Sequence, residues 1–517
     1  MASKRWFGLA LAVLMFFASS SIVLGWAVNT HVAITDTAMS LQVCPADSRW
    51  YQGGIYSQGN NWCWNLDTYL RQANLLNYLG FGPGGLSQQI PGMDDTGQPL
   101  TFNNQPPTVQ QWIEKGAKDE DSSVLRSWNH YHNPLQKDWS QAGLHTVLFR
   151  QGQSSVVWAQ LLVGEQAKYG TTDFPFYPYS WEDAREYYYR ALTATNDADR
   201  NNFFGKTFAA LGHVMHLIED AAVPDHTRNH VHGEACFWPL SLLGATCSIE
   251  DWADRDVNAG IVSSFLATAS GLAAPDPTFG ITVIGLDSKP NQLATIPIAQ
   301  VFDTGKYVGT NPDATAPKPE TFPVGIAEYS NANFVSKGTI FTQEYPYPSQ
   351  KTSVGTNSDD PDYLMKIGDG ESNIPHFVRV NKGLMRYWSQ YDLDDKCYND
   401  HAALLIPRAA RYASVIPYYF FRGQLTAVSS GDNNHIYVAN GSDERMYNGK
   451  VTVLQNINGQ WEQVGNELTP VPDLNTGGWI DTGISVTNGI SAIVVYRGGL
   501  GRESDAVVGT LRLYLDP

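Results

Sequence analysis

The sequence predicts a mainly α-helical protein that ends in an all-β domain. Helical patterns recur from residue 26 to about residue 265, and short β-rich runs separated by turn residues begin at Leu425. The chain has 517 residues, too many for one ordinary domain, and its hydrophobic content of 43% is that of a folded globular protein. We therefore expect a large helical domain over 26–423 and a β-sandwich-like accessory domain over 424–517.

The N-terminus predicts a secretion signal. Two basic residues precede an apolar stretch at 7–24, and Val23 and Gly25 occupy the −3 and −1 positions of a cleavage site. Cleavage of residues 1–25 would leave Trp26 as the first residue of a secreted or periplasmic protein. Because the stretch approaches the length of a membrane span, an uncleaved anchor is the alternative.

Within the helical domain, local patterns place several elements. A helix is expected to begin after Ser180 in "SWEDAREYYYRALTAT", because serine is a favourable N-cap. The following helix carries an apolar stripe at spacings of four, three and four residues, formed by Phe204, Phe208, Leu211 and Met215. Residues 270 to about 370 are rich in Pro, Thr, Asp and Gly and predict an irregular insertion. Helix-compatible patterns return at 376–393 and 402–421 and could pack back on the first helices.

The C-terminal domain is predicted from alternating runs such as "HIYVA", "KVTVLQ" and "AIVVYR". Asn-Gly pairs begin at positions 440, 448, 458 and 488, and this dipeptide favours tight hairpin turns. A small β-sandwich is the natural interpretation. The pattern leaves two roles open, a stabilising or adhesive module and a module that docks on membrane or substrate.

Charge and cysteine content narrow the classes of partner. The formal net charge is −17, and such an acidic surface argues against duplex nucleic acid as the partner. Five cysteines occur without a C-x-x-C pair, which in an exported protein favours disulfides. Proximity in the sequence pairs Cys44 with Cys63 and Cys236 with Cys247, and leaves Cys397 unpaired or as a surface thiol.

Histidines cluster in one part of the chain. Nine of the twelve lie between His31 and His232, and five of those lie in the twenty residues from His213. In "LGHVMHLIEDAAVPDH", His216 and Asp220 are four residues apart and share one face of a helix. Imidazole and carboxylate at this spacing suit zinc, and a carboxylate has two oxygens that can bridge two ions. An ordinary helix end with polar residues is the alternative.

The residues around this helix supply further candidates. We expect Pro224 to end the helix and His226 to turn back toward it, with His213 as a donor behind the ligands. Upstream, acidic residues at 119–121 lie nine to eleven positions before His130, a spacing that lets both reach one ion. His132 is expected either behind the ligands or against the substrate.

These motifs together resemble a known family. "WAVNTH", "EKGAKDED", "NHYHNP" and "HLIEDAAVPDH" occur in the order found in bacterial zinc-dependent phospholipases C and the related fungal single-strand nucleases. The resemblance covers residues 26 to about 265, roughly half the chain. It implies a helical bundle that encloses three zinc ions, and a mature N-terminal tryptophan that binds zinc through its free amine and carbonyl.

Carried over by motif, the resemblance implies nine protein ligands for three zinc ions. They are Trp26, His31, Asp121, His130, His216, Asp220, His226, His232 and Glu250. In this scheme Trp26 and His31 share the first ion with bridging Asp220. The second ion takes Asp121, His130, His216 and Asp220, and the third takes His226 with a later histidine and glutamate.

The third site departs from the family pattern. The simplest family form has histidine and glutamate four residues apart, which "HVHGE" offers as His230 and Glu234. However, "IEDWAD" is more similar to the glutamate-bearing helix start of the family, which favours His232 and Glu250. An inserted loop closed by a disulfide would then separate the two ligands.

The resemblance implies a secreted zinc-dependent phosphodiesterase, with a phospholipase C that releases diacylglycerol and a phosphorylated head group as the leading interpretation. Asp121 is implied to orient or deprotonate the attacking water. The alternatives are a single-strand nuclease or 3′-nucleotidase, and a non-catalytic surface-binding protein stabilised by zinc. Three aromatic residues could contact either substrate: Tyr51, Trp128 and Tyr131. The expected partners are phospholipid or another phosphodiester, with peripheral membrane contact and no obligate protein partner.

Overall fold

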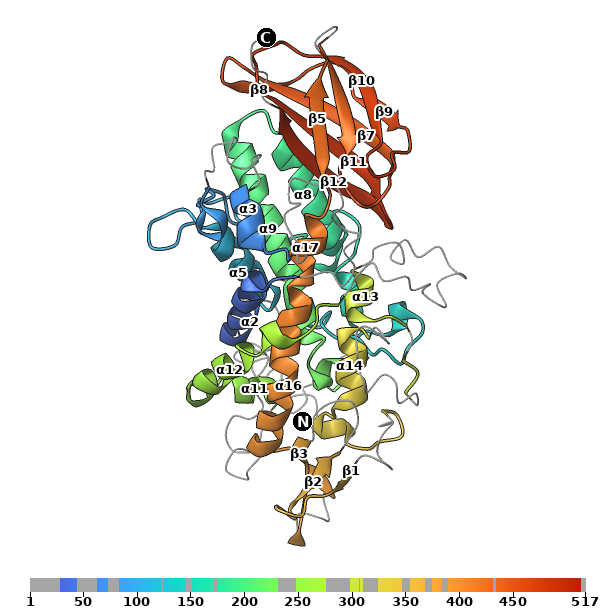
Figure 1. The fold of residues 1–517 in the computed structure, drawn as a ribbon. Helices are drawn as coiled ribbons and strands as arrows, with labels where there is room; N and C mark the ends of the chain where they lie inside the picture. The colour runs from blue at the N-terminus through green and yellow to red at the C-terminus, as the bar shows by residue number, and fades with distance from the viewer. Residues whose placement is uncertain are drawn as a thin grey trace, which may run out of the picture.

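The computed structural model of the protein joins a helical body to a C-terminal β region (Figure 1). The described residues are 28–43, 63–72, 83–122, 124–145, 151–171, 175–230, 248–275, 298–305, 307–309, 324–345, 354–367, 374–383, 389–430 and 434–512. The predicted combination of a helical part followed by a β part is confirmed at this level. A small sheet, β1–β4, lies at the end of the molecule opposite to the C-terminal β region.

Among the described residues, five longer helices form the centre of the helical body. They are α2 (Val28–Ser40), α5 (Val109–Glu120), α8 (Trp181–Thr193), α9 (Asp197–Asp220) and α16 (Asp395–Ala413). Helix α16 contacts both α2 and α9, so the predicted return of residues 402–421 onto the first helices is confirmed. The predicted stripe of Phe204, Phe208, Leu211 and Met215 is fully buried.

Short polar residues start these helices as the sequence predicts. The side chain of Ser180 accepts a hydrogen bond from the backbone N–H of Asp183, and the carboxylate of Asp183 accepts one from the backbone N–H of Ser180, which completes a capping box. Thr108 and Gln111 form the same arrangement at α5. Each box satisfies backbone N–H groups that have no partner inside the helix.

Two glycines bring α5 and α9 into unusually close contact. A Cβ atom on Gly116 would lie 1.9 Å from the backbone oxygen of Ala209, and one on Gly212 would lie 2.0 Å from the oxygen of Ile113. Both distances are far below van der Waals contact, so neither position can carry a side chain unless the helices separate. The backbones of α5 and α9 therefore touch directly beside the histidine-rich end of α9.

Smaller elements complete the helical body. Described short helices are α3 (Leu66–Gln72), α6 (Val124–Ser127), α7 (Ser155–Trp158), α10 (Pro224–Thr227), α11 (Ile249–Ala253), α12 (Ala259–Leu266), α13 (Ala299–Phe302), α14 (Ile326–Asn333) and α17 (Val415–Phe420). The insertion expected over 270–370 thus contains α13 and α14 in its described parts. The expectation that Pro224 ends α9 is wrong in detail, because α9 ends at Asp220 and Pro224 begins α10.

The helix-compatible pattern at 376–393 is a further correction, because its described residues form strands. The antiparallel sheet consists of β1 (Val354–Thr356), β2 (Tyr363–Lys366), β3 (Ile374–Val380) and β4 (Tyr391–Asp392). Strand β3 carries Phe377 and three β-branched side chains in seven residues, and such residues favour a pleated surface. Packing of β3 against α16 selects the strand.

The C-terminal region contains two antiparallel sheets around one core. Its strands are β5 (Leu425–Ser429), β6 (His435–Asn440), β7 (Met446–Ile457), β8 (Gln460–Gln463), β9 (Leu468–Val471), β10 (Trp479–Ser485), β11 (Ala492–Leu500) and β12 (Glu503–Arg512). One sheet has the order β10-β6-β5 and the other β12-β11-β7-β8, with β9 also paired to β7. Buried residues of both sheets, such as Ile436 and Val453, belong to one apolar cluster, as in a sandwich.

The Asn-Gly pairs occupy different kinds of backbone structure. Asn458 and Gly459 both have positive φ angles and join β7 to β8, which is the predicted hairpin turn. Asn448 and Gly449 instead lie inside β7, where the register shifts, so the turn expected there is wrong. Close contact with the ring of Tyr496 requires glycine at position 449.

The larger sheet is covered on both faces. Strand β11 is buried along nearly its whole length, because one face meets the smaller sheet and the other packs on α8. At this junction the carboxylate of Glu503 accepts hydrogen bonds from Arg185 (Nε, 2.7 Å), Arg422 (Nη1, 2.7 Å) and Trp181 (Nε1, 2.8 Å). The β region is therefore fixed to the helical body by a buried ionic contact.

Two further observations bear on the sequence predictions. Cys397 is free and buried, so it is not the surface thiol considered above. Cys63 is disulfide-bonded, whereas Cys44, Cys236 and Cys247 lie outside the described residues. Among the helices of the described residues, none has the length and apolar character needed to cross a membrane.

Candidate metal centre

The C-terminal end of α9 supplies the central side chains of the site. The last sixteen residues of this helix, from Gly205 onward, are buried with the single exception of Lys206, and His216 and Asp220 have no exposed surface. Their spacing of four residues places both on one face. The helix thus carries an imidazole and a carboxylate into the interior of the helical body.

Helix α5 brings a pair of acidic side chains to the same place. Glu120 is its last residue and Asp121 caps its C-terminus. The close crossing at Gly116 and Gly212 sets the separation between these carboxylates and α9.

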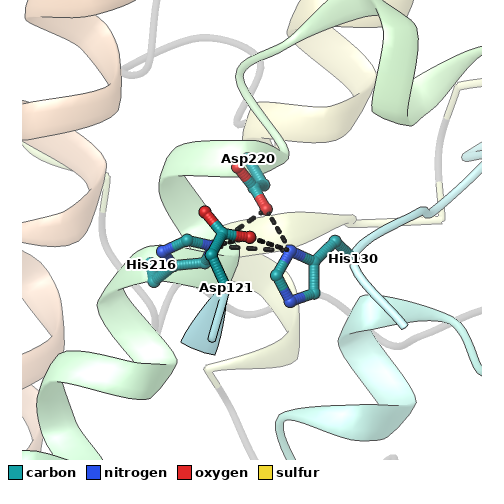
Figure 2. A group of neighbouring side chains, drawn as sticks. All are labelled: Asp121, His130, His216 and Asp220. Atoms are coloured by element: carbon teal, nitrogen blue, oxygen red, sulfur yellow. Dashed lines mark hydrogen bonds and ion pairs between the residues drawn. The ribbon is translucent and has the colours of Figure 1, made fainter. Parts of the chain in front are cut away.

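Four side chains from three segments meet in the first donor group, which comprises Asp121, His130, His216 and Asp220 (Figure 2). Each offers one ligand atom, and these atoms lie within 4.8 Å of one another. An oxygen of Asp220 lies 2.7 Å from Nδ1 of His130 and 3.1 Å from Nε2 of His216. An oxygen of Asp121 lies 3.5 Å and 3.6 Å from the same two nitrogens.

The two distances from Asp121 match those of a tetrahedral cation site, whereas the two from Asp220 are shorter. Zinc bonds to nitrogen and oxygen are about 2.0–2.2 Å long, so neighbouring donor atoms of a tetrahedral site are about 3.3–3.6 Å apart. Within the described part of the chain, both oxygens of Asp121 and of Asp220 are buried without a hydrogen bond of good geometry. Buried carboxylates need a positive partner, and a cation between the four side chains would supply it.

A second donor group shares Asp220 with the first. It contains Asp220, His226 and Glu250, and Nε2 of His226 lies 3.2 Å from Oε1 of Glu250. Pro224 at the start of α10 turns the chain back, which directs His226 toward the end of α9. Glu250 lies in the first turn of α11. Because Asp220 has two oxygens, it is placed to bridge two ions.

His31 on α2 lies beside both groups. Its Nε2 is 3.2 Å from Oδ1 of Asp220 and 3.9 Å from an oxygen of Asp121. Its ring stacks on that of His216, with centroids 3.8 Å apart. The structure therefore brings six of the predicted ligands together around Asp220: His31, Asp121, His130, His216, His226 and Glu250.

The electrostatics of the site favour added positive charge. Burial lowers the pKa of His130, but hydrogen bonding and charge attraction from Asp220 outweigh this and raise it to about 9. Burial likewise opposes charge on His216, yet Asp220 and Asp121 raise its pKa well above the ordinary value. Burial raises the pKa of Asp220, but the surrounding histidines hold it well below the usual range. Protons and a metal cation would compete for these donors.

Behind the first group, Glu120 connects several buried polar side chains. It accepts hydrogen bonds from Nε of Arg126 (2.7 Å) and Nε1 of Trp158 (2.8 Å), and it pairs closely with Nδ1 of His213. Nε2 of His130 lies 3.5 Å from the same carboxylate. His213 is thus separated from the donor group by Glu120, which agrees with its predicted place behind the ligands.

His132 faces away from the donor groups. Its Nδ1 lies 2.8 Å from Oγ of Ser154 and its Nε2 lies 2.8 Å from Oδ2 of Asp303. All three side chains are buried, and Asp303 also accepts a hydrogen bond from Trp139. The expectation that His132 contacts the substrate is therefore wrong. The hydrogen bonds among these three residues instead connect the loop that carries His130 to the segment before α14.

The remaining predicted residues divide into two classes. Trp26, Tyr51, His232 and Glu234 lie outside the described residues. His230 is described, and its Nδ1 lies 2.6 Å from Oδ1 of Asp225. Tyr131 has no exposed surface and stacks on His226, so the expectation that it offers a substrate platform is wrong, whereas Trp128 is half-buried.

Several contributors to the site were not predicted from the sequence, among them Glu219, Asp303 and Ser154. Glu219 could have been found, because it directly precedes Asp220 on the same helix. Asp303 and Ser154 had no local signal, since their partner His132 lies 171 and 22 residues away.

Comparison with known proteins adds no assignment. No family model matches the chain, and no curated protein matches it. The chemistry of the site therefore depends on the side chains themselves.

Proposed function

We propose that the protein is a secreted zinc-dependent phosphodiesterase, and specifically a phospholipase C. The observation that carries the proposal is the pair of buried donor groups that share Asp220. Neighbouring metal sites joined by a carboxylate are typical of enzymes that cleave phosphoesters. The resemblance of "HLIEDAAVPDH" and the three upstream motifs to zinc-dependent phospholipases C supplies the substrate class.

The donor set favours zinc over the alternatives. The first group offers two imidazoles and two carboxylates, and the second offers one imidazole and two carboxylates. Calcium and magnesium prefer oxygen ligands alone, whereas imidazole suits zinc and related ions. We propose three zinc ions. His31 joins the two donor groups as a further ligand, and Trp26 and His232, which lie outside the described residues, complete the set.

Each side chain then has a defined task. Asp220 orients two sites at once, and His130 and His216 hold the first site through one ring nitrogen each. Bound zinc supplies Lewis-acid chemistry that polarises a phosphoryl oxygen and activates water. Asp121 orients the attacking water and accepts its proton, since its oxygens have no other hydrogen-bond donor of good geometry among the described residues.

The proposal is tested by metal content and substrate choice in one preparation. The purified mature protein is stripped with chelator, reloaded with zinc and assayed on phosphatidylcholine vesicles and on single-stranded DNA. We expect about three zinc ions per chain and release of phosphocholine, both lost on stripping. Cleavage of DNA alone would select the nuclease, and bound zinc without turnover of either substrate would favour a surface-binding protein.

A further inference from the structure

Glu219 occupies an unexpected position in the site. It directly precedes Asp220 and has no exposed surface, yet it belongs to neither donor group. Its Oε2 lies 2.6 Å from Nδ1 of His31, and its Oε1 accepts a hydrogen bond of 2.7 Å from the hydroxyl of Thr35. Both oxygens are therefore engaged on the side of α2, so Glu219 does not point at the donor groups as a ligand.

One end of α9 thus fixes the imidazole of His31 from three directions. Glu219 contacts Nδ1, Asp220 faces Nε2 at 3.2 Å, and the ring of His216 stacks against one face. These three residues occupy positions three and four apart or adjacent on the same helix, so the backbone of α9 sets their relative geometry. These three contacts hold the ring of His31 in one orientation.

The contact at Nδ1 decides which nitrogen can bind a cation. A carboxylate can only accept a hydrogen bond. The neutral imidazole that faces Glu219 must therefore carry its proton on Nδ1. Its lone pair then lies on Nε2, which is the nitrogen directed at Asp220 and which has no hydrogen-bond partner among the described residues. A carboxylate behind a ligating histidine fixes the tautomer and also increases the basicity of the ligand.

We infer that Glu219 is a positioning residue that holds His31 as the Nδ1–H tautomer. In this tautomer, Nε2 of His31 and Oδ1 of Asp220 bind one ion together. The inference depends on the proposed metal centre but not on which substrate the enzyme cleaves. Thr35 supports this arrangement, because its hydroxyl donates a hydrogen bond to the second oxygen of Glu219.

Metal affinity provides the first test. Zinc binding is measured by competition with a chelator in the wild type, Glu219→Ala, Glu219→Gln and Glu328→Ala. We expect Glu219→Ala to weaken one site by about 10–100-fold. Glu219→Gln should retain most of the affinity, because its carbonyl oxygen can still accept a hydrogen bond from Nδ1–H. Glu328 is the matched control, because it is a buried carboxylate that accepts hydrogen bonds from Thr304 and Tyr307 away from the donor groups. Its removal should lower the melting temperature and leave zinc affinity unchanged.

Nitrogen-15 NMR of the zinc-loaded wild type provides the second test, which does not require any variant to fold. We expect His31 to show a protonated Nδ1 and a metal-bound Nε2. The opposite assignment, or wild-type affinity in Glu219→Ala, would overturn the inference. A protein that binds zinc as described but cleaves no phosphodiester would instead contradict the proposed function and leave the role of Glu219 standing.

Discussion

Asp220 is the residue on which the two donor groups depend. It is fully buried, its two oxygens face His31, His130 and His216, and it is the only member common to both groups among the described residues. A change at this position removes charge from both sites at once. By contrast, His132 lies next to the site in sequence but contacts Ser154 and Asp303.

We therefore expect Asp220→Asn to impair metal binding and His132→Ala to impair only the stability of the fold. Asp220→Asn should weaken zinc binding by at least about 100-fold and abolish turnover, since it alters a direct ligand rather than a supporting contact. His132→Ala should retain zinc but lower the free energy of unfolding by about 1–3 kcal/mol, because Asp303 and Ser154 lose a buried partner. Zinc analysis and urea unfolding of both variants decide the matter. Equal loss of zinc in the two variants would mean that His132 belongs to the metal site.

The second donor group permits a similar comparison. Glu250 lies 3.2 Å from His226, so Glu250→Gln should reduce the zinc content by about one ion per chain. Glu234→Gln should leave the zinc content unchanged if His232 and Glu250 are the ligands. The reverse outcome in metal analysis would select the pair His230 and Glu234 instead.

Residue-scale prediction succeeded where local spacing carries the information. His216 and Asp220 are one helical turn apart, and His130 follows an acidic cluster at short range, so their convergence could be anticipated. The contacts of His132 could not, because they join segments up to 171 residues apart. Glu219 directly precedes Asp220, but its contacts with His31 and Thr35 join segments 188 and 184 residues apart, so its role has no local pattern.

At the scale of elements, the crossing of α5 and α9 sets the geometry of the site. Asp121 follows α5, and His216 and Asp220 end α9, so the distance between the helices fixes the distances between the donors. Gly116 and Gly212 make that distance short.

Gly212→Ala should therefore damage metal binding although it touches no ligand. The new Cβ would lie 2.0 Å from the oxygen of Ile113, so α5 and α9 must move apart. We expect weaker zinc binding and a loss of about 1–3 kcal/mol in the free energy of unfolding. Gly260→Ala is the control, since nothing lies within 4 Å of its Cβ in α12 and alanine favours the helix by about 1 kcal/mol. Chelator competition and thermal unfolding of both variants test this, and unchanged zinc affinity in Gly212→Ala would show that the crossing tolerates expansion.

Element types were predictable to the extent that caps and periodicity act locally. Ser180 and the stripe on α9 define their helices without reference to the rest of the chain. The strands β3 and β4 were mistaken for helix because their apolar residues fit both periods, and the choice depends on packing against α16.

At the scale of the whole molecule, the β region is part of the folded core rather than a tethered module. Apolar residues of its larger sheet, including Ile493 and Val495, belong to the same buried cluster as the helices. The run "AIVVYR" is nearly continuous in apolar residues, which is typical of a strand covered on both faces, so this burial was partly encoded in the sequence. The ion pairs at the junction were not predictable, because Arg185 and Glu503 are 318 residues apart.

Glu503 makes this junction sensitive to acid. Burial raises the pKa of its carboxyl, but the guanidinium groups of Arg185 and Arg422 outweigh burial and lower the pKa to about 2, from an ordinary value of 4.5. A carboxyl with a depressed pKa in the folded state stabilises the protein above its unfolded pKa, and the stabilisation is lost as the pH falls toward the folded pKa. The contribution is about 3 kcal/mol, present above pH 4.5 and lost progressively between pH 4.5 and pH 2.

Glu503→Gln should remove this part of the acid sensitivity. The variant should be less stable than the wild type near pH 7, because Arg185 and Arg422 lose a buried charge partner. The difference in the free energy of unfolding should then shrink as the pH is lowered from 5 to 3, because the unfolded wild type takes up a proton on Glu503 below pH 4.5 while the folded wild type keeps this carboxylate ionised down to about pH 2. Urea unfolding across this range measures the difference directly. The contributions of the other carboxylates to the pH dependence cancel, because both proteins contain them.

Asp473→Asn is the control: its pair with Arg445 is about half exposed, so it should change stability by less than about 1 kcal/mol at any pH. A constant difference between Glu503→Gln and the wild type from pH 7 to pH 3 would mean that the charge of Glu503 does not hold the β region to the helical body, and that apolar packing of the larger sheet does so alone.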